Sequence, residues 1–138
     1  MRLILLVLLL PFFPRPDHKL TPGDVLTRDA QKVCTAGYSR SVRAVSAATK
    51  RAVYASYGIT APKPAQYEVD HLISLELGGS NSQKNLWPEP TPGSYSKDSL
   101  ENALHRAICA KRIPIDSAQR WIARDWVSAY RAMKKGKL

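Results

Sequence analysis

The chain has 138 residues, of which 21 are Lys or Arg and 11 are Asp or Glu, so its formal net charge is +10 at pH 7. This length supports one domain with a modest hydrophobic core and argues against a multi-domain enzyme. The positive charge indicates a polyanionic partner, either nucleic acid or an anionic surface, and the alternative is a basic surface without such a partner.

The first 13 residues are typical of a signal peptide. Arg2 precedes an apolar run of about ten residues, too short to cross a bilayer core that needs about 20. The small residues of a cleavage site are missing near Phe13, so an uncleaved N-terminal anchor is the alternative. We therefore expect a secreted or periplasmic protein, without stable membrane association once residues 1–13 are removed.

Residues 14–24 are rich in proline and predict a linker, which leaves residues 25–138 as the folded domain. Export would expose Cys34 and Cys109 to an oxidising environment, where two cysteines in a small domain commonly pair. The bridge would close a loop of 75 residues (109 − 34) and contribute about 4 kcal/mol. The alternative is two buried thiols that pack as small hydrophobic groups.

The first regular elements expected are one helix and two short strands. Ser46 can cap a helix over residues 47–57, which Gly58 would end. Residues 67–71 predict a strand, and an apolar pattern continues from it to a turn at Gly78-Gly79. Leu86 and Trp87 predict a second strand that Pro88 would terminate.

Two helices are expected in the C-terminal half of the chain. Ser96 is a suitable cap for a helix over residues 97–110, whose core-facing positions include Leu100 and Leu104. A last helix, capped by Asp116 or Ser117, would run to about residue 133 and carry an apolar stripe. The predicted order from residue 67 onward is therefore strand, turn, strand, loop and helix.

The segment Tyr-Glu-Val-Asp-His at 67–71, the glycine turn, Asn85 and the following polar helix together resemble the HNH branch of the His-Me finger endonucleases, and more loosely its small exported bacterial members. In that family an Asn follows the catalytic His by about fourteen residues, as Asn85 follows His71. The resemblance implies an α+β fold with a ββα-metal core, flanked here by N-terminal and C-terminal helices.

Phosphodiester hydrolysis requires an activated water and groups that neutralise the charge on the phosphate. A neutral His71 suits the first task, because its ordinary pKa lies near 6.5, and a structural histidine is the alternative. Asp70 can hold a divalent cation, or instead pair with a surface Lys or Arg. Alternation along a strand would point these side chains to opposite faces, so we expect a bend or bulge there.

The resemblance also implies roles for an amide and for a ligand on the following helix. Asn85 would fix its loop or orient His71. Asn102 and His105, three residues apart, are the two candidates to complete a metal site with Asp70. We expect one divalent ion, with magnesium or manganese favoured by an oxygen-rich site and zinc or nickel plausible if His105 binds.

Further charged residues are candidates for phosphate contacts or supporting roles. Lys97 and Arg106 on the helix could contact phosphate, and Glu68 could pair with Arg40 or Arg43 and so position the arginine for phosphate. The resulting prediction is a metal-dependent endonuclease of low sequence specificity, acting on DNA or alternatively RNA, with His71 as general base. The alternatives are a nucleic-acid-binding module with a degenerate HNH core and a purely structural secreted protein.

Overall fold

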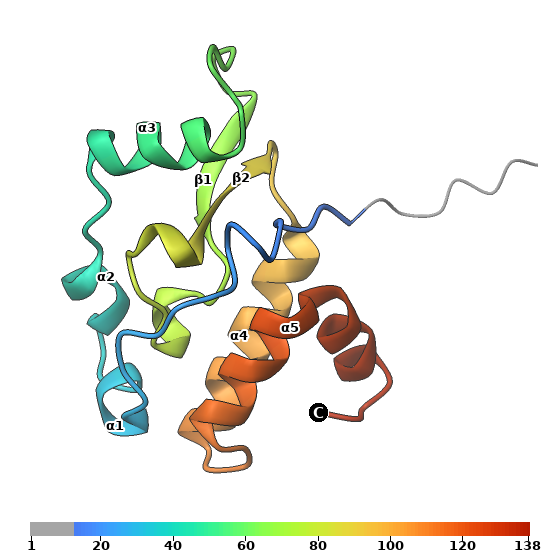
Figure 1. The fold of residues 1–138 in the computed structure, drawn as a ribbon. Helices are drawn as coiled ribbons and strands as arrows, with labels where there is room; N and C mark the ends of the chain where they lie inside the picture. The colour runs from blue at the N-terminus through green and yellow to red at the C-terminus, as the bar shows by residue number, and fades with distance from the viewer. Residues whose placement is uncertain (1–12) are drawn as a thin grey trace, which may run out of the picture.

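The computed structural model describes residues 13–138, which form both helices and strands (Figure 1). The α-helices are α1 (Ala30–Val33), α2 (Tyr38–Val42), α3 (Ala47–Ser56), α4 (Tyr95–Cys109) and α5 (Ile115–Lys134). Two short 3-10 helices, η1 (Leu75–Leu77) and η2 (Gln83–Asn85), lie between strands β1 (Tyr67–His71) and β2 (Leu86–Pro90). The predicted α+β class is confirmed. The predicted signal peptide lies outside the described residues except for Phe13.

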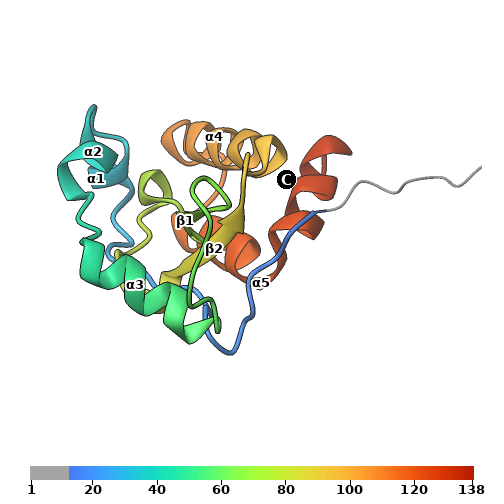
Figure 2. The ribbon, with the colours of Figure 1, turned by 90° about the horizontal axis from the view of Figure 1, so that it is seen from above.

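Strands β1 and β2 pair antiparallel in a continuous register that runs from Tyr67 opposite Pro90 to His71 opposite Leu86. The prediction that Pro88 ends the second strand is wrong, because β2 continues to Pro90. Within residues 13–138 the sheet has two strands, so each strand has an open edge where a missing proline N–H is tolerated. The sheet lies between α3 and α4 (Figure 2).

The helices begin where local capping groups allow. Ser46 caps α3 as predicted, by accepting a hydrogen bond from the backbone N–H of Thr49. Ser94, and not Ser96, caps α4 through the N–H of Lys97, so this helix starts two residues earlier than expected. The last helix α5 follows Pro114, and no side-chain cap is formed by Asp116 or Ser117.

Helix α5 bends at Asp125, as its two segments show in Figure 1. The backbone of Asp125 is non-helical (φ −164°, ψ 94°). Its carboxylate accepts hydrogen bonds from the N–H of Val127 and the hydroxyl of Ser128, which are the contacts of a helix N-cap. Asp125 therefore starts a second helical segment inside α5.

The hydrophobic core joins the two C-terminal helices to the segment around β1. Its buried members include Leu72, Leu77, Trp87, Leu100, Leu104, Ile122 and Trp126. Each of these side chains is at most 2% exposed. The core therefore fixes α4 and α5 beneath the sheet and leaves the end of β1 between α3 and α4.

The predicted linker 14–24 is part of the folded domain, so the prediction that the fold begins near Val25 is wrong. Trp126 Nε1 donates to the carbonyl of Pro14 at 3.1 Å, and Arg15 pairs with Asp125. Thr21 is fully buried, and its hydroxyl donates to the carbonyl of Leu86 at 2.9 Å. This segment therefore packs against the domain, with a turn at residues 18–20, and is not a solvated spacer.

The predicted disulfide between Cys34 and Cys109 is confirmed, with 5.6 Å between the two Cα atoms. It joins the end of α1 to the end of α4. Among residues 13–138, no helix combines the length and the apolar character needed to cross a membrane.

Candidate functional site

His71 is the last residue of β1, and its side chain is held by a neighbouring amide. Its Nε2 lies 3.1 Å from Oδ1 of Asn81. The Nδ2 of Asn81 donates to the carbonyl of Val42 at 2.8 Å, and Oδ1 also accepts from the N–H of Ala44. This pattern assigns the proton of the neutral imidazole to Nε2. The other nitrogen, Nδ1, has no hydrogen-bond partner within residues 13–138 and can accept a proton.

Burial favours the neutral form of this imidazole. His71 is only 5% exposed, and desolvation lowers the pKa of His71 below its usual value of 6.5. The hydrogen bond to Asn81 and the charge of Asp70 act in the opposite direction, while Arg43 and Lys97 add to the decrease. The net lowering makes His71 a neutral base at physiological pH.

A cavity of about 300 Å³ opens beside His71. It is formed between β1, the α2–α3 connection and α3, and its lining residues are Arg43, Val45, Lys50, Tyr54, Tyr67, Glu68, Val69 and His71. Two cationic side chains, Arg43 and Lys50, share this cavity with the imidazole. In this arrangement the two cations can bind an anionic group, and the neutral base can accept a proton from a water molecule beside that group.

Asn85 fixes the loop that follows β1 and does not contact His71. Its Oδ1 accepts the N–H of Ile73 at 2.9 Å, and its Nδ2 donates to the carbonyls of Ile73 and Ser80. A Cβ at Gly79 would collide with the Ile73 carbonyl oxygen and with Asn85 Nδ2, so this contact requires glycine. Of the two predicted roles for Asn85, fixing the loop agrees with these hydrogen bonds, and it is Asn81 that contacts His71.

A buried lysine lies on the opposite side of β1. The Nζ of Lys97 on α4 donates to Asp70 Oδ2 at 2.8 Å, to the carbonyl of His71 at 2.8 Å and to Glu101 Oε1 at 2.5 Å. Lys97 is 1% exposed and Glu101 is 9% exposed. The spacing of Lys97 and Glu101 by four residues places both on the face of α4 that meets β1.

Two carboxylates near Lys97, those of Glu101 and Glu89, are protonated more readily than usual. Burial raises the pKa of Glu101 to about 7, and the charge of Lys97 opposes this rise. Burial, with the nearby charge of Asp70, raises the pKa of Glu89 to about 7 as well. Burial disfavours the charged form of Lys97, but Glu101 and Asp70 outweigh it and raise the pKa of Lys97 above its ordinary value. The ammonium therefore remains charged.

The expected bend between Asp70 and His71 is absent. Their pairing with Trp87 and Leu86 follows the regular register of the sheet. Regular alternation directs His71 toward Asn81 and the cavity, and Asp70 toward Lys97. The prediction that both side chains share one site is therefore wrong, because the strand remains regular to its end.

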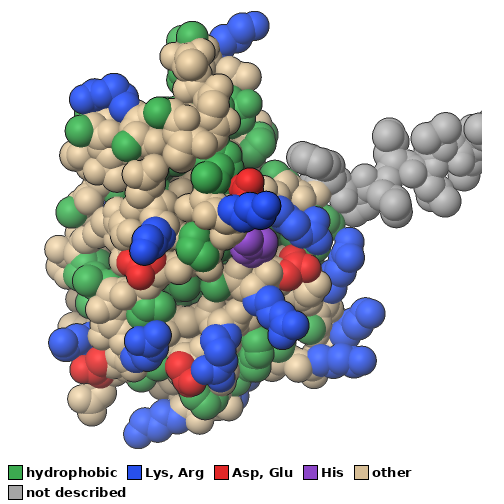
Figure 3. All heavy atoms as spheres, viewed as in Figure 1, with side chains coloured by type: hydrophobic (Ala, Val, Ile, Leu, Met, Phe, Trp, Pro, Cys, Tyr) green, Lys and Arg blue, Asp and Glu red, His purple; other side chains and the backbone are tan. Residues whose placement is uncertain are grey.

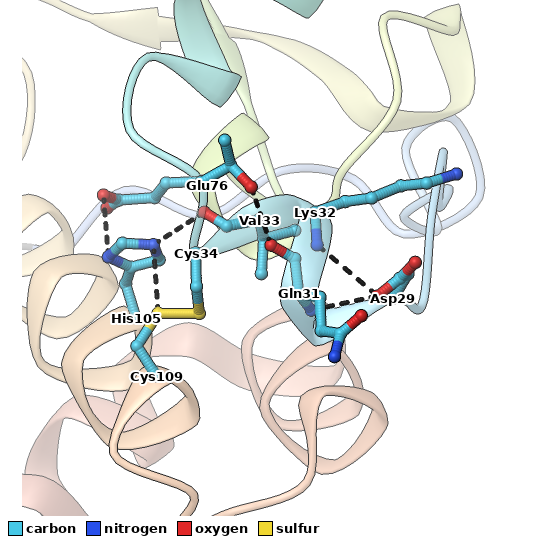
Figure 4. Close-up of a disulfide and its surroundings, with 9 residues drawn as sticks. Asp29, Gln31, Lys32, Val33, Cys34, Glu76, His105 and Cys109 are labelled. Carbon is cyan, nitrogen blue, oxygen red and sulfur yellow. Dashed lines mark hydrogen bonds and ion pairs between the residues drawn. A yellow bond between two sulfur atoms is a disulfide. The ribbon is translucent and has the colours of Figure 1, made fainter.

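The two predicted helix ligands do not join Asp70. Asn102 is exposed and lies about 100° around α4 from Glu101. His105 is two helical turns, about 12 Å, beyond Lys97. Figure 4 shows His105 between Glu76 and the Val33 carbonyl, with Nε2 3.0 Å from that oxygen and 3.5 Å from Cys109 Sγ.

These residues do not fit the divalent cation that the resemblance implies. The carboxylate of Asp70 already faces an ammonium, and neither Asn102 nor His105 approaches it. A second group, Cys34, His105 and Cys109, has metal-ligand atoms within 4.8 Å of one another. Both sulfur atoms belong to the disulfide, so neither is a thiolate that could bind a metal.

The predicted phosphate contacts differ in their surroundings. Arg43 is exposed and lines the cavity, so this prediction agrees with its position. Arg106 is exposed on α4. The prediction for Lys97 is wrong, because its three donors are used inside the protein. Glu68 lines the cavity with Arg43, but the described residues include no ion pair for it.

Sequence reasoning missed three residues of this region. Asn81 was not among the predicted site residues, although an Asn between a glycine turn and a 3-10 helix offers a donor and an acceptor to nearby groups. Glu101 was also not among the predicted site residues, and its spacing of four residues from Lys97 was the available signal. Nothing in the sequence placed Lys50 near His71, because the contact depends on the approach of α3 to the sheet.

Comparisons with known proteins identify no relative of this chain: no protein-family profile, no curated protein and no solved structure matches it.

Proposed function

We propose that this protein is an endonuclease that hydrolyses phosphodiester bonds of nucleic acid, with His71 as the general base. The observation that carries the proposal is the neutral imidazole with an available Nδ1 in a cavity shared with two cationic side chains. The proposal also rests on the resemblance of the segment 67–105 to the HNH endonucleases. DNA is the expected substrate, and RNA is the second substrate class.

In the proposed reaction, a phosphate group lies between Arg43 and Lys50 at the mouth of the cavity. Nδ1 of His71 removes a proton from a water molecule, and the resulting hydroxide attacks phosphorus in line with the leaving oxygen. The P–O bond to that oxygen breaks, and the leaving alkoxide takes a proton from solvent water. The cationic side chains stabilise the charge on the non-bridging oxygens as the transition state forms. Asn81 keeps Nε2 protonated and so keeps Nδ1 in the basic form.

The surface supports binding to the backbone of nucleic acid more than to its bases. Figure 3 shows many Lys and Arg side chains and fewer acidic ones on one face, with several cationic groups over α5. The two strands near the cavity have five residues each and belong to a small, partly buried sheet. We therefore propose low sequence specificity and an affinity that falls as salt concentration rises.

The disulfide and the apolar N-terminal sequence support a secreted or periplasmic location for this activity. This location is part of the proposal. An oxidising compartment would keep α1 and α4 joined while the protein encounters nucleic acid from outside the cell.

The test is cleavage of supercoiled plasmid by the full oxidised chain, compared with His71→Ala and with His18→Ala. His18 is an exposed histidine outside the cavity and serves as the matched control. We expect nicking by the wild type and by His18→Ala, and none by His71→Ala, with unchanged plasmid binding in all three. Salt-sensitive binding without cutting by any of them would instead identify a non-catalytic nucleic-acid-binding module.

A further inference from the structure

We propose that Lys97 is the resident cation beside β1, and that Asp70 consequently holds no divalent metal ion during hydrolysis. That Lys97 is the resident cation concerns binding alone and is independent of activity. That hydrolysis proceeds without a metal ion on Asp70 is the catalytic half of the proposal, and it deepens the proposed function and rests on it. Lys97 is a positioning residue in this scheme, because its ammonium contacts the backbone of His71 and not the substrate.

The ammonium group of Lys97 occupies the space between β1 and α4. A lysine side chain has three N–H donors, and Nζ places them on Asp70, Glu101 and the His71 carbonyl. Nζ is within 2.8 Å of all three oxygens. A magnesium or manganese ion would need the same carboxylate oxygens at about 2.0–2.2 Å, so it could bind there only if the ammonium left.

Departure of the ammonium is opposed by the surroundings of Lys97. The side chain is 1% exposed, and its stem is enclosed where α4 meets β1. If the lysine moved away, Glu101 and the nearby Glu89 would remain in a region of low solvent access, whereas the side chain of Asp70 is 31% exposed. Loss of one partner from a buried ion pair is strongly unfavourable, because it leaves an uncompensated charge. The exchange of lysine for a metal ion is therefore opposed by the fold.

The same contacts explain how Lys97 assists the base. Its hydrogen bond to the His71 carbonyl ties α4 to the last residue of β1. The imidazole of that residue points to the other side of the strand, where Asn81 fixes it. Lys97 thereby positions the main chain of His71, while Asn81 positions the ring. A divalent ion has no role in either contact.

The binding test uses thermal unfolding of the full oxidised chain with and without millimolar Mn²⁺. We expect Mn²⁺ to change the Tm of the wild type and of Asp70→Asn by the same small amount. Lys97→Met should gain a Mn²⁺-dependent rise in Tm, because it uncovers Asp70 and Glu101. Lys134→Met, on the exposed surface of α5, is the matched control and should gain none.

A rise in wild-type Tm with Mn²⁺ that disappears in Asp70→Asn would overturn the proposal, because it would show a metal ion bound to this carboxylate. If Lys97→Met does not fold, the comparison of wild type with Asp70→Asn decides the question alone. Equal shifts in these two proteins support the proposal, and unequal shifts overturn it.

The catalytic half is tested by plasmid cleavage after dialysis against EDTA. We expect the wild type to retain its rate within about twofold, and loss of cutting that Mn²⁺ restores would overturn this half. A chain that cuts under no condition would refute the proposed endonuclease, while the Tm comparison would still report on Lys97. The two failures are therefore distinguishable.

Discussion

Replacement of Lys97 by Met should reduce the free energy of unfolding by about 3–5 kcal/mol, the usual cost of removing one partner from a buried ion pair. Met retains most of the apolar stem, so the loss arises from the ammonium and its contacts to Asp70, Glu101 and the His71 carbonyl. Because a domain of this kind is stable by only about 5–15 kcal/mol, the change is a large fraction of the total.

The cost should depend on pH. Without Lys97, the buried Glu101 loses the attraction that lowers its pKa, so its folded-state pKa lies further above the ordinary value of 4.5. An acid with a raised folded-state pKa stabilises the fold when it is protonated and loses this contribution as pH rises above its unfolded-state pKa. The variant should therefore approach wild-type stability near pH 5 and differ most near pH 8.

Urea unfolding followed by the fluorescence of the buried Trp87 and Trp126 measures this effect. With a slope of about 1–3 kcal/mol/M, a loss of at least about 3 kcal/mol lowers the midpoint by at least about 1 M. Lys134→Met is the surface control and should stay within about 0.5 kcal/mol of the wild type. A loss below about 1 kcal/mol for Lys97→Met at pH 8 would refute the reasoning, because it would mean that Lys97 is solvated.

Four further outcomes are expected. Since burial lowers the pKa of His71 below its usual value of 6.5, the cleavage rate should fall toward acid pH as the imidazole is protonated, with a midpoint below pH 6.5; a midpoint above 6.5 would contradict this. Asn81→Ala should lower kcat about 10- to 100-fold with little change in Kd, and an unchanged kcat would exclude a positioning role. Arg43→Ala should reduce the slope of log affinity against log salt by about 1 in a titration of DNA binding, whereas an equal slope would remove Arg43 from the phosphate contacts. The double replacement of Cys34 and Cys109 by Ser should cost about 2–5 kcal/mol in urea unfolding, and a smaller loss would mean that the bridge constrains the unfolded chain little.

The features that sequence predicted well have signals that are local in the chain or that depend only on residue chemistry. Ser46 and Gly58 bracket α3, and both signals act within one helical turn. The strand over residues 67–71 and the disulfide between Cys34 and Cys109 were also predicted correctly. Each depends on a short pattern or on a simple chemical pairing.

The elements that sequence predicted poorly depend on contacts between distant segments. Whether Lys97 reaches phosphate or the carboxylate of Asp70 is decided by the packing of α4 against β1. The register that separates Asp70 from His71 is set by pairing with β2. His105 is a residue type that commonly binds metal ions, but α1 packs close to it and its Nε2 lies beside the Val33 carbonyl. Spacing along one helix could not distinguish these outcomes.

Residues 14–21 have a consequence for the order in which the native structure can form. Arg15 and Asp125 are 110 positions apart, and Pro14 and Trp126 are 112 apart. Pro14 and Arg15 therefore form these contacts only after residues 125 and 126 have been synthesised, and closing such long loops slows folding. A nascent chain that lacks α5 cannot form these contacts, so completion of the fold must follow synthesis of its C-terminal helix.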